Sequence, residues 1–469
     1  MGTTIKSIEE AVGEPYALMA LAVSCTATIE MPECALRAAR RTLLDTLGVS
    51  AAGSATIGGV ASYAAAPKIW GGGGSTVWFS NLKLPPAGAA FVNASYAAAL
   101  DLDDGHRAAS GHPAAAIIPA VLAVGETMRA SPARLLTAIV LGYEVAVRSS
   151  AARDIANLRT TDSGLWCGLG AAAAAGWLCQ HSAPVIAHAM AIAGQTATSQ
   201  AATGWTRIGH TVKEGIPWAT ANGLQAVALA LAGHQGPMDL LDDPSTYDRA
   251  TLLENFGRDW SIETSYFKIY SCCRWAHAAI DAALALKDTM QISSDAIENI
   301  FVEIFDRALT LPNQTEPMSN EAAQYSIPFC MAVALTYGAD ALLPLRDDHL
   351  TDLSVINLAK RIQLRRASDY AGVFPVATPA RVTIAANGRL ERLEIPLPKG
   401  EPKNPLSDAD LQRKFQRLAV MGSLCADDAK EILDVVTNLQ FHEPADLFAA
   451  LGPTSDRQQR CIRSRNSNH

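Results

Sequence analysis

Apolar residues recur at helical spacing through the first half of the chain. Four leucines between positions 36 and 47 fall on one face of a helix that would begin near Pro32, since proline is well tolerated in a first helical turn. Similar segments, separated by glycine and proline, continue from about residue 8 to residue 260, and no alternating run there is long enough for a strand. We expect this part of the chain to be all-α.

The pattern changes after Trp260. Residues 297–306 (IENIFVEIFD) are typical of a strand. Alternating segments on either side of Asn387-Gly388 predict a β-hairpin, because Asn-Gly favours the tight turn between antiparallel strands. Two helical stretches are expected among these strands, at residues 277–288 and 322–337. This part is therefore predicted to be α+β.

A proline-rich segment, residues 396–405, leads to a last helical region. Ser407 is typical of a helix start, and helical periodicity continues to Leu451. The simplest interpretation is a mainly α fold, in which a smaller α+β lid domain is inserted into a large all-α domain built from both chain ends. The expected boundaries are residues 1–264 and 401–469 for the all-α domain and residues 265–400 for the lid.

Composition and charge argue against several classes of protein. Hydrophobic residues make up 49% of the 469 residues, but the longest charge-free apolar stretch, residues 164–179, is mostly Ala and Gly. That stretch is shorter than the roughly 18 strongly apolar residues of a membrane span, so we expect a buried helix and no membrane contact. The net charge is −8, and the one basic stretch is residues 460–465. We therefore expect no nucleic-acid partner.

Short motifs exclude further possibilities. Nine cysteines without CxxC spacing argue against a disulfide framework and a structural zinc site. Glu9 and Glu10 interrupt the apolar run that a signal peptide needs, so we expect a cytoplasmic protein. The glycine-rich segment 70–75 lacks the GK[ST] ending of a phosphate-binding loop, and we expect it to be a connection.

The densest polar cluster lies between two helical stretches, residues 91–100 and 114–128. Its charged and titratable residues are Asp101, Asp103, Asp104, His106, Arg107 and His112. Histidine beside carboxylates is suited to general acid–base catalysis, because a carboxylate orients the ring and raises its basicity. The same residue types bind metal ions, and a solvated surface turn is a third possibility. The residues alone leave these three interpretations open.

A second cluster precedes the helix expected at residues 277–288. Its polar residues are Lys268, Tyr270, Arg274 and His277. Cationic groups near a helix N-terminus would bind anions, because the backbone N–H groups there already favour negative charge. The alternative is a hinge between the domains, with the aromatic residues in the core.

Lys213 and Glu214 precede a further expected helix, residues 219–232. A lysine amine serves as a base only when burial or nearby cations lower its pKa. An ordinary surface ion pair is the alternative interpretation of these two neighbours.

Five segments together resemble the MmgE/PrpD family, whose members include dehydratases, decarboxylases and epimerases. They are LDLDDGHRAASGHPAAAIIPAVLA (residues 100–123), LGYEVAVR (141–148), LGAAAAAGWL (169–178), VKEGIPWATANGLQAVALALAG (212–233) and FKIYSCCRWAHAAIDAAL (267–284). The resemblance implies a large helical domain with a smaller lid and a site between them. It also implies a homodimer, a small di- or tricarboxylate substrate, and neither cofactor nor metal.

The resemblance assigns roles to the polar clusters. Asp101, His112, Lys213 and Lys268 match positions that serve catalysis or substrate binding in the family. The full set of expected catalytic residues is Asp101, His106, His112, Lys213 and Lys268. The expected substrate-binding residues are Asp104, Arg107, Tyr270, Arg274 and His277.

Three positions depart from the dehydratases and decarboxylases of the family. Gly105 stands where many relatives have Thr, Thr161 where the decarboxylases have His, and Phe329 where they have Tyr. The loss of His and Tyr removes two proton donors that dehydration or decarboxylation would use. Epimerisation needs only a base and an acid on opposite faces of a carbanion, with cations to hold the carboxylates.

These departures predict an epimerase that inverts the carbon next to a carboxylate in an amino-dicarboxylate such as iminodisuccinate. Two alternatives are kept. One is a hydro-lyase or decarboxylase of the same family, and the other is a relative that binds its ligand without turnover.

Overall fold

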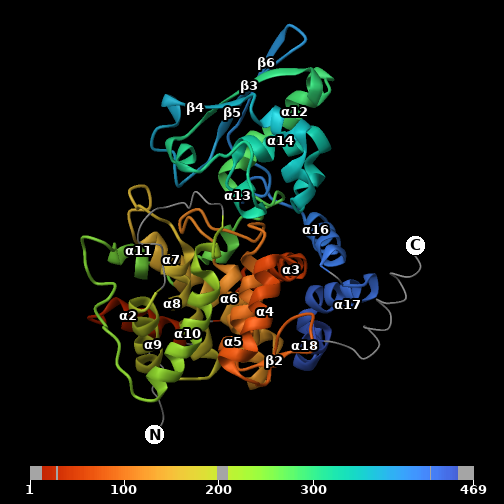
Figure 1. Ribbon diagram of the computed structural model, residues 1–469. Helices are drawn as coiled ribbons and strands as arrows, with labels where there is room; N and C mark the ends of the chain where they lie inside the picture. The colour runs from red at the N-terminus through yellow and green to blue at the C-terminus, as the bar shows by residue number, and fades with distance from the viewer. Residues whose placement is uncertain (1–12, 28–29, 198–209, 423, 453–469) are drawn as a thin grey trace.

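The computed structural model describes residues 13–27, 30–197, 210–422 and 424–452. The segment around Glu9 and Glu10 and the basic stretch 460–465 lie outside the described residues. Figure 1 shows a large helical body below and a smaller body above that contains the four-stranded sheet. The mainly α fold with a small sheet domain, predicted from the sequence, is confirmed.

The large body is built from helices of the first half of the chain. They are α2 (Ala17–Thr26), α3 (Glu33–Gly53), α4 (Ile57–Trp70), α5 (Pro86–Ala98), α6 (Ala114–Met128), α7 (Pro132–Ala151), α8 (Cys167–Leu178), α9 (Ala183–Gln195), α10 (Ile216–Leu231) and α11 (Arg249–Leu253). Small residues let these helices approach closely. A Cβ added at Gly170 of α8 would lie 2.4 Å from the Gly142 carbonyl oxygen of α7.

One short ladder was not predicted in this body. Strands β1 (Ser75–Thr76) and β2 (Lys83–Leu84) pair antiparallel after the glycine-rich connection that follows α4. Two-residue strands are too short to produce an alternating pattern, so the sequence carries no signal for them.

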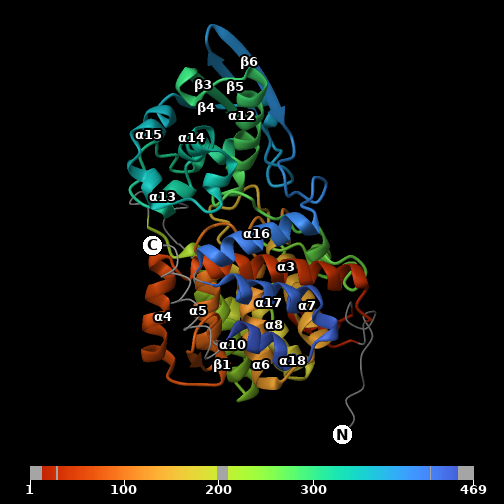
Figure 2. The same cartoon turned by 90° about the vertical axis from the view of Figure 1, so that its right-hand side faces the viewer.

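The last helices pack on the first ones. Helices α16 (Asp408–Met421) and α17 (Ala426–Thr437) lie against α3, as Figure 2 shows, and α18 (Pro444–Leu451) contacts α6. Ser407 and Asp410 form the predicted helix start as a reciprocal cap of α16. Phe415 of α16 packs against Gly48, where a Cβ would lie 3.0 Å from the Phe415 Cα.

The smaller body contains a sheet of order β4-β3-β5-β6. Its strands are β3 (Ile297–Ile304), β4 (Ile362–Arg366), β5 (Ala380–Ala386) and β6 (Arg389–Ile395). The predicted strand at residues 297–306 and the hairpin at Asn387-Gly388 are confirmed. Strand β4, which pairs parallel with β3, was not predicted.

Helices α12 (His277–Met290) and α14 (Ile327–Tyr337) pack on this sheet. Helices α13 (Asn320–Gln324) and α15 (Leu353–Ala359) pack on α14. The single helix expected at residues 322–337 is wrong, because the chain breaks at Tyr325 and Ser326. The Ser326 side chain accepts a hydrogen bond from Phe329 N and starts α14 as a new helix.

Among the described residues, no single helix has both the length and the apolar character to cross a membrane. Helices α3 and α4 meet those criteria only when taken together, and they are bent by 90° at their junction.

Candidate active site

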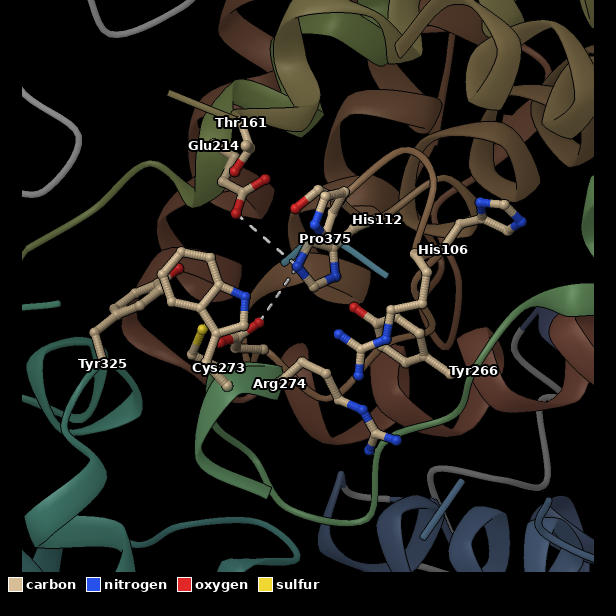
Figure 3. A pocket seen from close by; sticks show the side chains of 14 residues that line it. His106, His112, Thr161, Glu214, Tyr266, Cys273, Arg274, Tyr325 and Pro375 are labelled. Carbon is tan, nitrogen blue, oxygen red and sulfur yellow. Dashed lines mark ion pairs between the residues drawn. The ribbon is translucent and has the colours of Figure 1, made fainter. Parts of the chain in front are cut away.

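A small pocket, with a cavity volume of about 30 Å³, lies where the loop between α5 and α6 meets the lid. Its wall is formed by Asp101, His106, Arg107, Ser110, Gly111, His112, Thr161, Glu214, Tyr266, Cys273, Arg274, Trp275, Tyr325 and Pro375. Figure 3 shows His112 near the centre of these side chains, with Glu214 and Tyr325 across from Tyr266. The polar cluster read from the sequence therefore faces a cavity and is not a solvated turn.

The loop is held by pairing with the segment that enters the lid. Gly105 and Tyr266 exchange backbone hydrogen bonds, with N···O distances of 3.0 and 2.8 Å. A Cβ at Gly105 would lie 2.3 Å from the Tyr266 ring. The departure from Thr at this position therefore has a physical reason, since the phenol of Tyr266 fills the space that a side chain would need.

Two of the expected catalytic residues, and the neighbour of one of them, have a strained backbone. Asp101, Lys213 and Glu214 have φ values of 50°, 50° and 56°. Residues other than glycine adopt this left-handed region at a cost, and such conformations concentrate at functional sites.

His112 is surrounded by carboxylates. Its Nδ1 lies 3.1 Å from Asp103 Oδ2 and 3.0 Å from the Asp104 carbonyl oxygen. Its Nε2 lies 3.7 Å from Asp101 and 3.9 Å from Glu214. Burial and the Lys268 ammonium lower the pKa of His112, but the charges of Asp103 and Glu214 outweigh them and raise it to about 9. His112 is therefore an imidazolium acid at neutral pH.

Lys268 is fully buried beneath Asp101. Its Nζ donates to Asp101 Oδ1 at 2.5 Å and to the Asp101 carbonyl oxygen at 3.1 Å. Burial lowers the pKa of Lys268, but Asp101 and Asp103 more than compensate and raise it above its usual range. Lys268 is thus a permanent cation and is unsuited to accept a proton.

Lys213 and Glu214 are not an ordinary surface pair, so that interpretation is wrong. Lys213 Nζ donates to the Gln324 side-chain oxygen, and burial lowers its pKa despite the nearby Asp101. Glu214 accepts from the backbone and side chain of Ser163, at 2.9 and 2.7 Å. Of the two lysines, Lys213 is the one whose pKa is lowered, as a lysine that exchanges a proton requires.

The remaining expected residues lie around or behind the pocket. Asp104 accepts from Tyr143 Oη at 2.8 Å, and burial raises its pKa to about 7. His106 lines the pocket, but burial lowers its pKa to about 4, so its ring is neutral. His277 is fully buried with a strongly lowered pKa, again because of burial. Tyr270 donates to Asp281 at 2.7 Å.

Two guanidinium groups reach the opposite wall. Arg107 and Arg274 line the pocket, and both form ion pairs with Glu401. Their Cζ atoms lie 5.0 and 4.8 Å from the centre of the Tyr266 ring, in cation–π geometry.

The metal interpretation has one geometric basis. Asp101, Asp103 and His112 can each direct one ligand atom so that these atoms lie within 4.8 Å of one another. The ammonium of Lys268 already serves as the cation of Asp101.

Several residues in or beside the pocket were not identified from the sequence. Tyr325 lines the pocket, whereas Phe329, the position compared with the decarboxylase tyrosine, is fully buried in the lid core. Glu401 stands between two prolines in the chain and carries no sequence signal. Cys273 and Tyr266 lie within the second polar cluster but were not assigned a role.

Comparison with known families decides the assignment of the fold. Residues 19–256 match the MmgE/PrpD N-terminal domain, and residues 270–440 match the MmgE/PrpD C-terminal domain. The chain belongs to the MmgE/PrpD family. The predicted family is therefore confirmed, and the pocket lies where the two MmgE/PrpD domains meet.

Relatives within the MmgE/PrpD family include cis-aconitate decarboxylases. The enzyme of Mus musculus is 28% identical over 89% of this chain and 90% of its own length, and that of Homo sapiens is 26% identical over 89% and 91%. The enzyme of Aspergillus terreus (strain NIH 2624 / FGSC A1156) is 25% identical over 76% and 79%. These relatives favour the lyase alternative over the epimerase.

Proposed function

We propose that this protein is a carbon–carbon lyase that decarboxylates cis-aconitate or a closely related small tricarboxylate. The observation that carries the proposal is His112, a largely buried imidazolium acid on the wall of a pocket that Arg107 also lines. The similarity to cis-aconitate decarboxylases over most of the chain supports the same reaction class.

Decarboxylation of such a substrate needs one proton donor. The carbon–carbon bond to the departing carboxylate breaks, and carbon dioxide leaves. The electron pair of that bond stays on the substrate and shifts the neighbouring double bond, so that a carbon at its far end must be protonated. His112 Nε2 is the candidate donor, because Nδ1 is held by Asp103 and the Asp104 carbonyl oxygen. The neutral ring that results is stabilised less by Asp103, so it regains a proton from solvent before the next turnover.

Cations hold the carboxylates that remain on the substrate. Arg107 lines the pocket directly, and Lys268 is paired with Asp101, which also lines it. The positive charges of Arg107 and Lys268 stabilise the electron-rich intermediate.

An epimerase remains the second candidate. It is favoured by Thr161, which lines the pocket and offers no group for proton transfer at neutral pH. The second departure, Phe329 in place of the tyrosine of the decarboxylases, supports an epimerase less well. Phe329 is buried in the lid core, and Tyr325 places a phenol on the pocket wall instead.

The test is incubation of the purified protein with cis-aconitate, 2-methylcitrate and iminodisuccinate. Products are followed by release of carbon dioxide, by mass and by chiral separation in deuterated water. Carbon dioxide released from cis-aconitate supports the proposal. Inversion of iminodisuccinate with deuterium uptake and no loss of mass would establish the epimerase, and saturable binding without any product would indicate a ligand-binding relative.

A further inference from the structure

Glu401 joins two guanidinium groups behind the pocket. It lies on the segment between β6 and α16 and is only 3% exposed. Its Oε1 accepts from Arg274 Nε at 3.0 Å and Nη2 at 2.7 Å, and also from Arg107 Nη2. Its Oε2 accepts from Arg107 Nε at 3.2 Å. One carboxylate thus orients two cations that come from different parts of the chain.

Arg274 has no donor left for a ligand. Besides Glu401, its Nη1 contacts His277 Nδ1 and the Lys399 carbonyl oxygen, each at 3.0 Å, and Nη2 reaches the Pro398 carbonyl oxygen at 3.5 Å. These contacts account for the five N–H groups of a guanidinium. A substrate carboxylate could bind Arg274 only by displacing a protein acceptor.

Arg107 differs in one respect. Its Nε and Nη2 are taken by Glu401 and by Thr378 Oγ1, the latter at 2.8 Å. Among the described residues, none accepts a hydrogen bond from Nη1. Because Arg107 lines the pocket, this edge of the guanidinium is available to an anion there.

The net charge of the cluster formed by Glu401, Arg107 and Arg274 also favours binding of an anion. Arg274 and Arg107 together lower the pKa of Glu401 against the effect of burial, so its carboxylate is ionised. Two guanidinium charges and one carboxylate charge leave one positive charge in excess. The cluster can therefore neutralise one carboxylate of a ligand.

We propose that Glu401 is a positioning residue. It holds Arg107 so that this arginine binds one substrate carboxylate, and it engages Arg274, which supports the cluster without contacting the substrate. The inference rests on the proposed function only in requiring a polycarboxylate ligand. It assigns substrate recognition to the loop between α5 and α6 and not to the arginine at the start of α12.

The test measures binding of propane-1,2,3-tricarboxylate, an unreactive tricarboxylate, by calorimetry. Glu401→Gln and Arg107→Ala are each expected to raise Kd about tenfold or more, as for a lost hydrogen bond to a charged group. The double variant should bind no more weakly than Arg107→Ala alone, since Glu401 acts through Arg107. Glu303→Gln on the lid sheet, which removes another carboxylate paired with two arginines, is the matched control and should leave Kd unchanged.

Steady-state kinetics separate positioning from a purely structural role. Glu401→Gln should raise KM with kcat within about threefold of wild type, because the anchor holds substrate and transition state alike. Melting temperatures monitor folding, and Arg107→Ala keeps the inference testable if Glu401→Gln is unstable. The inference would be overturned if folded Glu401→Gln had the wild-type Kd. It would also be overturned if the increase in Kd of the double variant equalled the product of the increases in the two single variants. Binding without turnover of cis-aconitate would refute the proposed function and leave this inference standing.

Discussion

His112 and Asp103 form a buried ion pair, in which Nδ1 of the ring lies 3.1 Å from Oδ2 of the carboxylate. The pair raises the pKa of His112 to about 9 although burial and Lys268 act in the opposite direction. Because the protonated ring is the proposed acid, kcat/KM should be insensitive to this group below that pH and fall above it.

Replacement of Asp103 tests this relationship. Asp103→Asn removes the charge that stabilises the imidazolium, so the alkaline limb of the kcat/KM profile should move about 1 to 3 pH units lower. The exposed Asp306→Asn is a control that should leave the limb in place. An unmoved limb in folded Asp103→Asn would mean that another group titrates there.

His112 itself should be indispensable. His112→Ala is expected to lower kcat by about two to four orders of magnitude, because general acid catalysis of this type contributes that much. Circular dichroism and the melting temperature should stay close to wild type. The half-buried His442, far from the pocket in the chain, provides the control His442→Ala. A folded His112→Ala with nearly full activity would make His112 structural only.

Lys268 should act as the internal cation of the site. Lys268→Met leaves Asp101 and Asp103 without their ammonium and should reduce kcat at least about a hundredfold, since an unpaired buried charge reorganises its surroundings. We expect a chelator to leave wild-type activity unchanged and added divalent ions not to restore the variant. Activity lost to the chelator and recovered with one specific ion would instead support a metal at Asp101, Asp103 and His112.

A second buried lysine ties the last helices to the site loop. Lys414 of α16 donates to Asp45 of α3 at 2.6 Å and to the Leu102 carbonyl oxygen at 2.9 Å. Lys414→Met should lower the free energy of unfolding by about 3 to 5 kcal/mol, because it leaves a buried carboxylate unpaired. Asp306→Asn breaks an exposed pair with Arg366 and should cost no more than about 1 kcal/mol. Denaturant unfolding measures the free energy of unfolding of both variants. Equally small losses of this free energy in the two variants would contradict the expectation.

The homodimer implied by the family resemblance can be tested on the apolar face of α4 and α10. Ile57, Ile69 and Trp218 are 85%, 62% and 44% exposed there. Light scattering should give a dimer for the wild type and a monomer for the double variant Ile57→Glu and Ile69→Glu. Leu353→Glu, at a site 71% exposed on the lid, should remain a dimer. A monomeric wild type would refute the expectation.

Local sequence patterns determined the element types and one half of the site. Asn387-Gly388 is the turn between β5 and β6, because its preferred backbone conformation is intrinsic to those two residues. Asp101, His106, Arg107 and His112 could be found together because one short loop carries them all to the same pocket. The family motifs are equally local, and for that reason the family could be recognised from the chain alone.

Tertiary packing decided the protonation states and the partners. The neighbours Lys213 and Glu214 alone could not be told from a surface ion pair, and only burial in the folded chain lowers the pKa of Lys213. Arg274 looked like a free carboxylate anchor until Glu401, 127 residues further along the chain, was found to occupy it. Contacts between distant segments depend on how helices and sheet pack, and desolvation depends on everything that surrounds a group. Neither quantity is encoded in the spacing of neighbouring residues, so the chemistry of this pocket emerges only from the folded chain.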